Sequence, residues 1–296
     1  MTRFLIGTES SLIEIGSDDT LLSKPTALAR GSDGWWSIAE RYRVMRSPDA
    51  RAWEEVEAVH GLRANCVLPH DGGALVGTSE AHLVLVAGGT TKHITSFDQV
   101  PSREDWYTPW GGPADVRSLS RGPDGAAYAN VHVGGILRSD DGETWRATSM
   151  DINADVHQVL AHPETPGLVF AATAVGLATS TDGGETWDFS EDGMHASYCR
   201  AVAIAGDTLL VSASKSHTGR QSGLYRRPLM GGAFERCEKG LPDWFADNVD
   251  TFCLDARGDV AILGTKDGLV FVSDDAGVTW HEEASGLPSV TCVAIS

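Results

Sequence analysis

The chain has 296 residues, and its 23 Lys and Arg residues against 41 Asp and Glu give a formal net charge of -18. A hydrophobic fraction of 42% argues against a disordered chain, because enough apolar side chain is present to offset the entropy lost on folding. The negative charge argues against nucleic acid and anionic membrane surfaces as main partners, since both would repel it.

The cysteines and the apolar stretches of the sequence indicate the cellular compartment of the protein. The chain has five cysteines and no C-x-x-C pair, which is typical of a reduced, intracellular protein. No apolar stretch has the length of a membrane span, and the N-terminal residues lack the apolar core of a secretory signal. We therefore expect a cytoplasmic protein.

The predicted elements are short strands from one end of the chain to the other. Residues 4–23 read as outer strands of a sheet that lacks its inner strand, and Val290–Ile295 reads as an inner strand without partners. Six complete units lie between them, and their inner strands are predicted to start near Pro25, Ala64, Val116, Val156, Cys199 and Val249.

Pairing of the two ends would complete a seventh unit from residues 1–23 and 289–296 and would remove two exposed sheet edges. The prediction is a single all-β domain over residues 1–296. It is a seven-bladed β-propeller of four-stranded antiparallel blades, closed by its N- and C-terminal strands, with six blades as the alternative.

A repeated string marks these units. Asp-x-Gly-x-Thr-Trp occurs at Asp140–Trp145, Asp182–Trp187 and Asp275–Trp280, and a weaker copy lies at Ser47–Trp53. Trp145 and Trp187 are 42 residues apart, and the steps from Trp53 to Trp145 and from Trp187 to Trp280 are about twice as long. The repeat unit is therefore in the forties of residues, which suits a four-stranded unit. The aspartate can accept backbone N–H bonds within its own turn, and the tryptophan then begins the next strand. The predicted role of Asp140, Trp145, Asp182, Trp187, Asp275 and Trp280 is therefore structural.

These residues resemble the Asp-box (BNR) repeats of β-propellers such as sialidases, sortilin-type receptors, xyloglucanases and photosystem II assembly factors. The resemblance implies that the repeat hairpins share one face of the propeller and that binding loops lie on the other. Sialidases carry a Phe/Tyr-Arg-Ile-Pro motif, whereas Tyr42–Met45 reads Tyr-Arg-Val-Met, so a classical sialidase is not expected. Xyloglucanases join two propellers, and this chain has the length for one.

A polar column follows the starts of the seven predicted inner strands. Its members are Thr26, Asn65, Arg117, His157, Arg200, Asp250 and Thr291. We predict that Arg117 and Arg200 anchor an anion, that His157 acts as base and that Asp250 orients it. The alternative is that these polar groups pair with one another and with water.

Histidines and aromatic residues supply further candidates. His82, His132, His157 and His195 are candidate ligands of a divalent transition metal, the alternative being separate, solvated histidines. The ligand-binding candidates are Asn65, His132, His195, Tyr198, Trp106, Tyr107, Trp110 and Trp244. The aromatic residues among them would suit a sugar ring or a partner side chain, and the alternative is that they fold back onto their own loops.

Two functions remain open at this point. The first is binding of a small anionic or polyhydroxylated molecule in a central funnel, with a hydrolase or lyase activity as its enzymatic form. The second is a non-catalytic propeller that binds or assembles with another protein.

Overall fold

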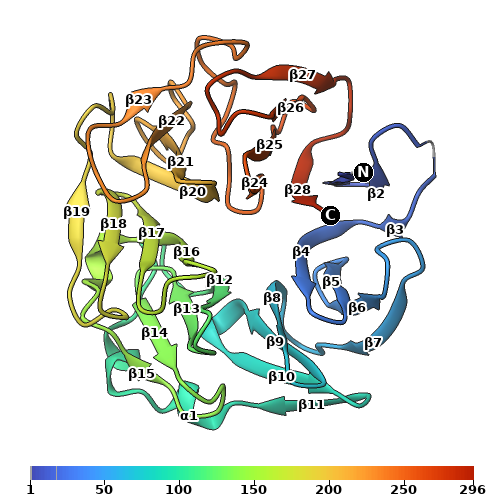
Figure 1. Cartoon of the computed structure of the whole chain (residues 1–296). Helices are drawn as coiled ribbons and strands as arrows, with labels where there is room; N and C mark the ends of the chain where they lie inside the picture. The colour runs from blue at the N-terminus through green and yellow to red at the C-terminus, as the bar shows by residue number, and fades with distance from the viewer. Residues whose placement is uncertain (1, 18) are drawn as a thin grey trace. The chain divides into compact units, whose positions relative to one another are not determined.

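A computed structural model describes residues 2–17 and 19–296 of the chain. It contains seven four-stranded antiparallel sheets, which are labelled by strand in Figure 1. Each sheet corresponds to one predicted unit, so the fold is a seven-bladed β-propeller, as predicted. No helix in the described part of the chain is long and apolar enough to cross a membrane.

The residues fall into two compact units. The Thr26 unit comprises Thr26–Ala171 and Ala178–Asp188. The Phe189 unit comprises the described part of Met1–Pro25 together with Ala172–Leu177 and Phe189–Ser296.

The Thr26 unit contains three sheets and most of a fourth. Their strands are β4 (Pro25–Gly31), β5 (Gly34–Ala39), β6 (Arg43–Ser47), β7 (Glu54–Ala58), β8 (Ala64–His70), β9 (Gly73–Thr78), β10 (Leu83–Ala87), β11 (Thr90–His93), β12 (Val116–Arg121), β13 (Ala127–Val131), β14 (Gly135–Ser139), β15 (Arg146–Ala147), β16 (Val156–Ala161), β17 (Val169–Thr173), β18 (Gly176–Ser180) and β19 (Asp188–Ser190). Its short helices are η1 (Ser79–Ala81), α1 (Thr95–Asp98), η2 (Pro101–Asp105) and η3 (Ile152–Ala154).

The Phe189 unit contains the other three sheets. Their strands are β20 (Tyr198–Ala205), β21 (Thr208–Ser214), β22 (Gly223–Pro228), β23 (Glu235–Arg236), β24 (Leu254–Arg257), β25 (Val260–Gly264), β26 (Val270–Ser273), β27 (His281–Ala284), β28 (Val290–Ile295), β1 (Phe4–Thr8), β2 (Ser11–Glu14) and β3 (Leu22–Ser23).

Burial follows strand position within a sheet. The second strands β9 and β13 are buried at every residue, whereas the fourth strand β11 is exposed at every residue. A strand covered on both faces needs apolar or small side chains throughout, which accounts for runs such as Gly73–Thr78. The fourth strands are short and polar, as expected of edge strands that must resist pairing with other chains.

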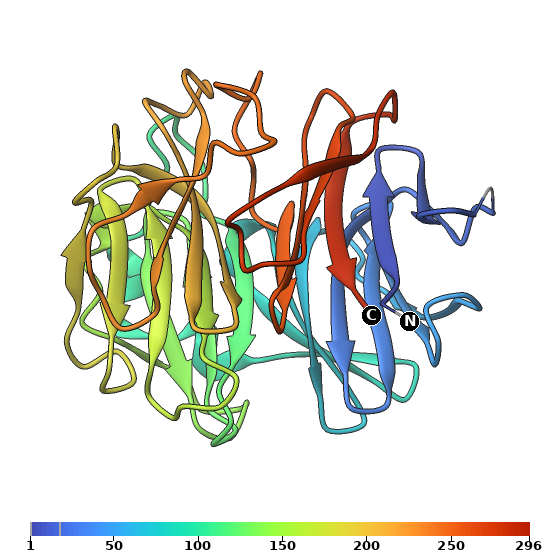
Figure 2. The ribbon, with the colours of Figure 1, turned by 45° about the horizontal axis from the view of Figure 1, so that its top comes forward.

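The N- and C-terminal strands pair, as predicted. β28 lies antiparallel beside β1, with Phe4 opposite Ile295 and Ile6 opposite Val293, and Figure 2 shows the two strands side by side in red and blue. The sheet runs β28-β1-β2-β3. Residues 1 and 18 of the predicted segment 1–23 lie outside the described residues.

The predicted start of one inner strand is wrong. A strand was expected from Val249, but β24 begins at Leu254. The Cys253 N–H donates to the Asp250 carbonyl at 2.9 Å, and Phe252 has a positive φ of 70°. A turn therefore occupies residues 250–253, and Asp250 lies in that turn instead of in a strand.

The repeated strings form turns held by a serine and an aspartate. Asp182 Oδ1 accepts the Thr186 N–H at 2.9 Å, its Oδ2 accepts the Thr186 hydroxyl at 2.6 Å, and the Ser180 hydroxyl donates to Oδ1 at 2.8 Å. Asp275 makes the same bonds with Thr279 and Ser273. These bonds to the charged form lower the pKa of Asp182 to about 2.

In the first copy the aspartate of the turn is Asp141, so the prediction for Asp140 is wrong. Asp141 Oδ1 accepts the backbone N–H groups of Glu143 and Thr144 at 2.8 and 2.6 Å, and the Ser139 hydroxyl donates to it at 3.0 Å. Asp140 instead pairs with Arg138 at 2.8 Å. This turn is one residue shorter than the Asp182 turn, and the Ser47–Trp53 turn has the same short spacing.

Candidate functional site

Some side chains of the polar column make hydrogen bonds to the backbone, and others form ion pairs. Asn65 Nδ2 donates to the Val116 carbonyl at 3.2 Å, and the Thr291 hydroxyl donates to the Pro25 carbonyl at 2.7 Å. Asn65 thus holds β12, the first strand of the next sheet, whereas the Thr291 bond lies within the Phe189 unit. Arg117 lies half-buried on β12.

Arg200 and Asp250 lie together in the Phe189 unit. Arg200 Nη2 is 2.5 Å from Asp250 Oδ1, and Lys266 Nζ is 3.2 Å from Asp250 Oδ2. Burial opposes the charge on Arg200, but the Asp250 carboxylate and the Tyr198 hydroxyl together outweigh burial and raise the pKa of Arg200. The pair that was expected to anchor and orient a ligand is therefore engaged internally.

His195 and Trp244 form a second polar and aromatic group of the Phe189 unit. His195 Nδ1 lies 2.5 Å from the Tyr225 hydroxyl, and its ring is 4.6 Å from that of Trp244. Arg236 covers Trp244 at 3.8 Å from the ring centroid. Trp244 is therefore folded back onto its own unit. Tyr198, at the start of β20, accepts a long hydrogen bond of 3.4 Å from Arg200.

The loop after α1 contains the remaining aromatic candidates, and Trp106 is its inner member. Trp106 lies 6.0 Å from the ring of Phe97 and carries Arg103 at 5.1 Å from its centroid. Arg103 also donates to the carbonyls of Ala81 and Glu80 at 2.6 and 2.9 Å. This half of the loop anchors the loop to the sheet that contains β9 and β10.

The other half of the loop presents aromatic side chains to solvent. Trp110 is 67% exposed and Tyr107 is 44% exposed. Trp110 stacks on His132, with ring centroids 5.1 Å apart and planes 24° apart. A turn from Thr108 to Gly111 holds the residue in place, since the Gly111 N–H donates to the Thr108 carbonyl at 3.0 Å.

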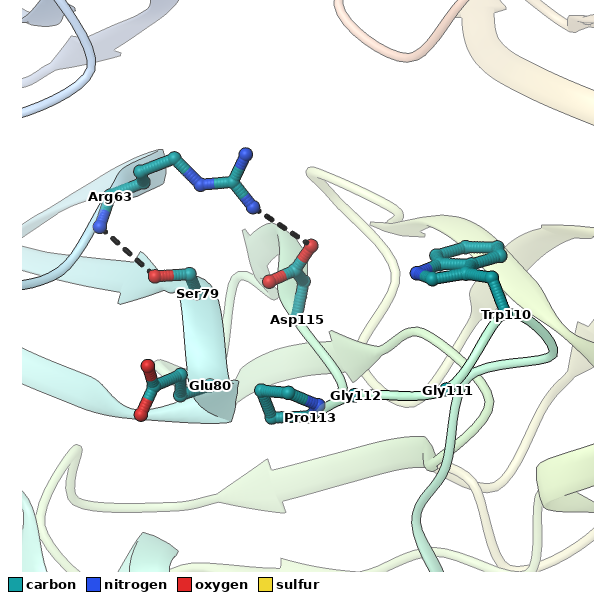
Figure 3. Close-up of a pocket in the computed structure, with 8 residues that line it drawn as sticks. All are labelled: Arg63, Ser79, Glu80, Trp110, Gly111, Gly112, Pro113 and Asp115. Carbon is teal, nitrogen blue, oxygen red and sulfur yellow. Dashed lines mark hydrogen bonds and ion pairs between the residues drawn. The ribbon is translucent and has the colours of Figure 1, made fainter.

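Trp110 lines a cavity of about 270 Å³ that Figure 3 shows in close-up. The other lining residues are Arg63, Ser79, Glu80, Gly111, Gly112, Pro113 and Asp115. Gly111 and Gly112 have φ values of 75° and 110°, so the wall beside Trp110 needs residues without a Cβ. This volume lies just below the range of ~300–1,000 Å³ of drug-sized pockets.

The charges around the cavity are of both signs, with an acidic excess. Arg63 Nη2 is 3.8 Å from Asp115 Oδ2, and the dashed line in Figure 3 marks this pair. The Arg63 N–H donates to the Ser79 hydroxyl at 3.0 Å. Glu80 has a positive φ of 60°, a conformation that few residues other than glycine adopt. With Arg63 paired to Asp115, Glu80 supplies the remaining charge.

Beneath Trp110, two histidines share one carboxylate. His132 Nε2 is 2.7 Å from Asp155 Oδ1, and His157 Nε2 is 3.5 Å from Asp155 Oδ2. His132 and His157 are 2% and 0% exposed. Burial would raise the pKa of Asp155, but the hydrogen bonds and charges of the two histidines outweigh it and hold that pKa well below its usual range.

His82, the remaining metal candidate, belongs to a different cluster of the Thr26 unit. Its Nδ1 is 2.8 Å from Asp98 Oδ1, and its ring lies 5.7 Å from that of His93. The four histidines proposed from the sequence thus lie in three places, and His132 and His157 are the two that the structure brings together.

Sequence reasoning missed Asp155, Asp115 and Arg63, which lie around Trp110 and His132. Each of them directly precedes a predicted first strand, at Val156, Val116 and Ala64. The predicted polar column consists of the residue that follows each strand start. The residues that line the site instead stand immediately before each strand start, two positions earlier. That column carries the signal that could have found them.

Comparisons with known proteins agree on the fold. No family model matches the chain, and no curated protein matches it. Among solved structures, YCF48 bound to a D1 peptide has a TM-score of 0.61 at 15% identity, over 95% of this chain and 85% of that one. The Pan2 WD40 domain of Neurospora crassa has a TM-score of 0.55 at 11% identity, over 87% and 78% of the two chains.

An enzyme is also among the similar structures. The GH74 enzyme of Niastella koreensis has a TM-score of 0.61 at 12% identity, and the match covers 88% of this chain but 45% of that one. The present chain therefore spans less than half of that enzyme. Together these likenesses define the class of protein, a seven-bladed β-propeller, and the class includes both enzymes and binding proteins.

Proposed function

We propose that this chain is a non-catalytic propeller of the Asp-box type that binds a partner protein through a lysine- or arginine-bearing segment. The observation that carries the proposal is Trp110, an aromatic ring that is 67% exposed and held from one side by His132. A ring fixed in this way offers its other face to a cation at little entropic cost.

The charge around Trp110 favours a cationic partner. Glu80 and Asp115 line the cavity with one basic residue, Arg63, which pairs with Asp115. The exposed Glu104 and Asp105 lie on the loop that contains Trp110. Arg103, the one basic residue of Val100–Ala114, is engaged with backbone carbonyls. The net charge of -18 would attract a basic segment at long range and raise its rate of association.

The size of the cavity supports a side chain as the ligand. A volume of about 270 Å³ suits the end of one long side chain better than an oligosaccharide. The structure of YCF48 bound to a D1 peptide provides a precedent for peptide recognition on this fold. The Ser–Asp turns at Ser139, Ser180 and Ser273 support the Asp-box assignment.

Catalysis is the less favoured of the two functions that the sequence left open. Arg200 and Asp250 are paired with each other, and His157 is fully buried beside Asp155. An acid or base that works on a substrate must reach it, and a buried imidazole does not.

A peptide array tests the proposal. Peptides with a central arginine or lysine should be retained, and the same peptides with citrulline or glutamate at that position should not. Trp110→Ala should weaken retention about tenfold, because a desolvated cation–π contact contributes up to ~2 kcal/mol.

Phe189→Ala is the matched control, since Phe189 is also an exposed aromatic residue, 44% exposed, and lies outside the cavity. It should leave retention unchanged. Equal retention of arginine and citrulline peptides, or equal loss in the Trp110 and Phe189 variants, would contradict the proposal.

A further inference from the structure

We propose that His132, Asp155 and His157 form a binding site for a divalent transition-metal ion, with Zn²⁺ as the best fit. The inference goes beyond partner binding and does not depend on it, because it rests on the side chains beneath Trp110 and not on the cavity.

The topology brings the three residues together from separate segments of the Thr26 unit. His132 directly follows β13, Asp155 directly follows η3, and His157 is the second residue of β16. One ligand atom from each lies within 4.8 Å of the other two. With metal–ligand distances of about 2.0–2.2 Å, these atoms need to move by about an ångström to enclose an ion.

The donor set determines the kind of ion. Two imidazole nitrogens and one carboxylate suit Zn²⁺ and its transition-metal neighbours, whereas Mg²⁺ and Ca²⁺ prefer sets made of oxygen alone. Three protein ligands leave a coordination position for water or for a group of a partner. The Asp155 side chain is 20% exposed, which leaves a route for the ion to enter.

The backbone holds the donors in position. Asp155 has a left-handed conformation with φ 53°, and Val133, beside His132, has φ 47°. Such conformations persist in residues other than glycine where the surroundings fix them, and they are frequent at binding sites. η3 is capped by Asp151, which accepts the Asn153 N–H at 2.9 Å, and Ala154 and Val156 on either side of Asp155 belong to a buried core cluster.

A second cluster of the same residue types serves as a comparison. His82, His93 and Asp98 also gather within 4.8 Å, but Arg103 Nη1 lies 3.8 Å from Asp98 Oδ1. A permanent cation at that carboxylate competes with a metal ion. His93 is exposed on β11, so this cluster is also less well enclosed.

Calorimetric titration of Zn²⁺ into chelator-treated protein without a histidine tag tests the inference. We expect one saturable site per chain, weakened at least tenfold by Asp155→Asn and by His157→Gln. His82→Gln is the matched control and should bind Zn²⁺ as the wild type does. At a Zn²⁺ concentration about a hundredfold above Kd, the wild-type Tm should rise by about 5 °C.

A second measurement uses the wild-type protein, so it does not depend on whether the variants fold. Co²⁺ in place of Zn²⁺ should give the visible absorption of a four- or five-coordinate ion with nitrogen and oxygen ligands. The spectrum of the hydrated ion, an absence of saturable Zn²⁺ binding, or a binding loss in His82→Gln with none in Asp155→Asn would each overturn the inference.

Discussion

At the scale of single residues, the Ser–Asp turns depend on a position with positive φ. Gly183 occupies it in the Asp182 turn with φ 75°, and Ala276 occupies it in the Asp275 turn with φ 55°. An alanine pays a steric penalty in this conformation that a glycine avoids. The Asp275 turn therefore carries a strain that the Asp182 turn lacks.

We predict that Ala276→Gly raises the free energy of unfolding by about 0.5–1 kcal/mol, measured by urea denaturation. Ala284→Gly is the control, because Ala284 is also half-buried but lies at the end of β27 and outside the residues of positive φ. That substitution should lower stability. A loss of stability in Ala276→Gly comparable with that in Ala284→Gly would show that the turn is not strained.

The sequence predicted the residue types of these turns better than their positions. Matching the string alone aligned Asp140 with Asp182, yet the Glu143 and Thr144 N–H groups are within reach of Asp141. The short turn loses one residue between the aspartate and the tryptophan, and a pattern of fixed length cannot detect that loss. Which carboxylate accepts the bonds is decided by local geometry.

At the scale of elements, β24 carries an unusual carboxylate. Asp255 Oδ2 accepts the Ile295 N–H of β28 at 2.8 Å. Burial raises the pKa of Asp255 to about 6, against an ordinary value of 3.8, because desolvation disfavours the charged form. The folded protein therefore binds a proton between pH 4 and 6 that the unfolded chain has released.

The contribution of Asp255 to stability should be greatest below pH 4 and should decline as the pH rises to about 6. Asp255→Asn keeps an oxygen for the Ile295 N–H and removes the charge. We predict that it raises the free energy of unfolding by about 1–2 kcal/mol at pH 8 and has little effect at pH 4. Denaturant titrations of both proteins across this range would measure the difference. A difference independent of pH would contradict the assignment.

Strand positions were largely predictable, and the exception has a local cause. The alternation of apolar residues with Gly-rich turns located the starts of β4, β8, β12, β16 and β28, and that of β20 to within one residue. The start of β24 was misplaced because Phe252 has a positive φ. A positive φ is rare for an aromatic residue, so the sequence does not indicate a turn at this position. Turns that contain glycine could be predicted from the sequence, whereas the turn at residues 250–253, which has no glycine, could not.

At the scale of the whole molecule, the sequence predicted the seven-bladed propeller but not the contacts of its loops. The fold follows from repeats that are read along the chain. The Trp110 cavity joins residues from before β8, after β9 and before β12, and their proximity depends on how adjacent sheets pack. From composition we predicted only which partners to exclude, and the basic partner that we propose rests on the Trp110 cavity together with the net charge of -18.

Hydrogen–deuterium exchange of the protein, with and without the best-retained basic peptide, tests the central claim most directly. We predict slower exchange over Thr108–Asp115 and around Glu80, with exchange over Leu241–Val249 unchanged. Protection confined to Leu241–Val249, or spread evenly over the chain, would contradict it.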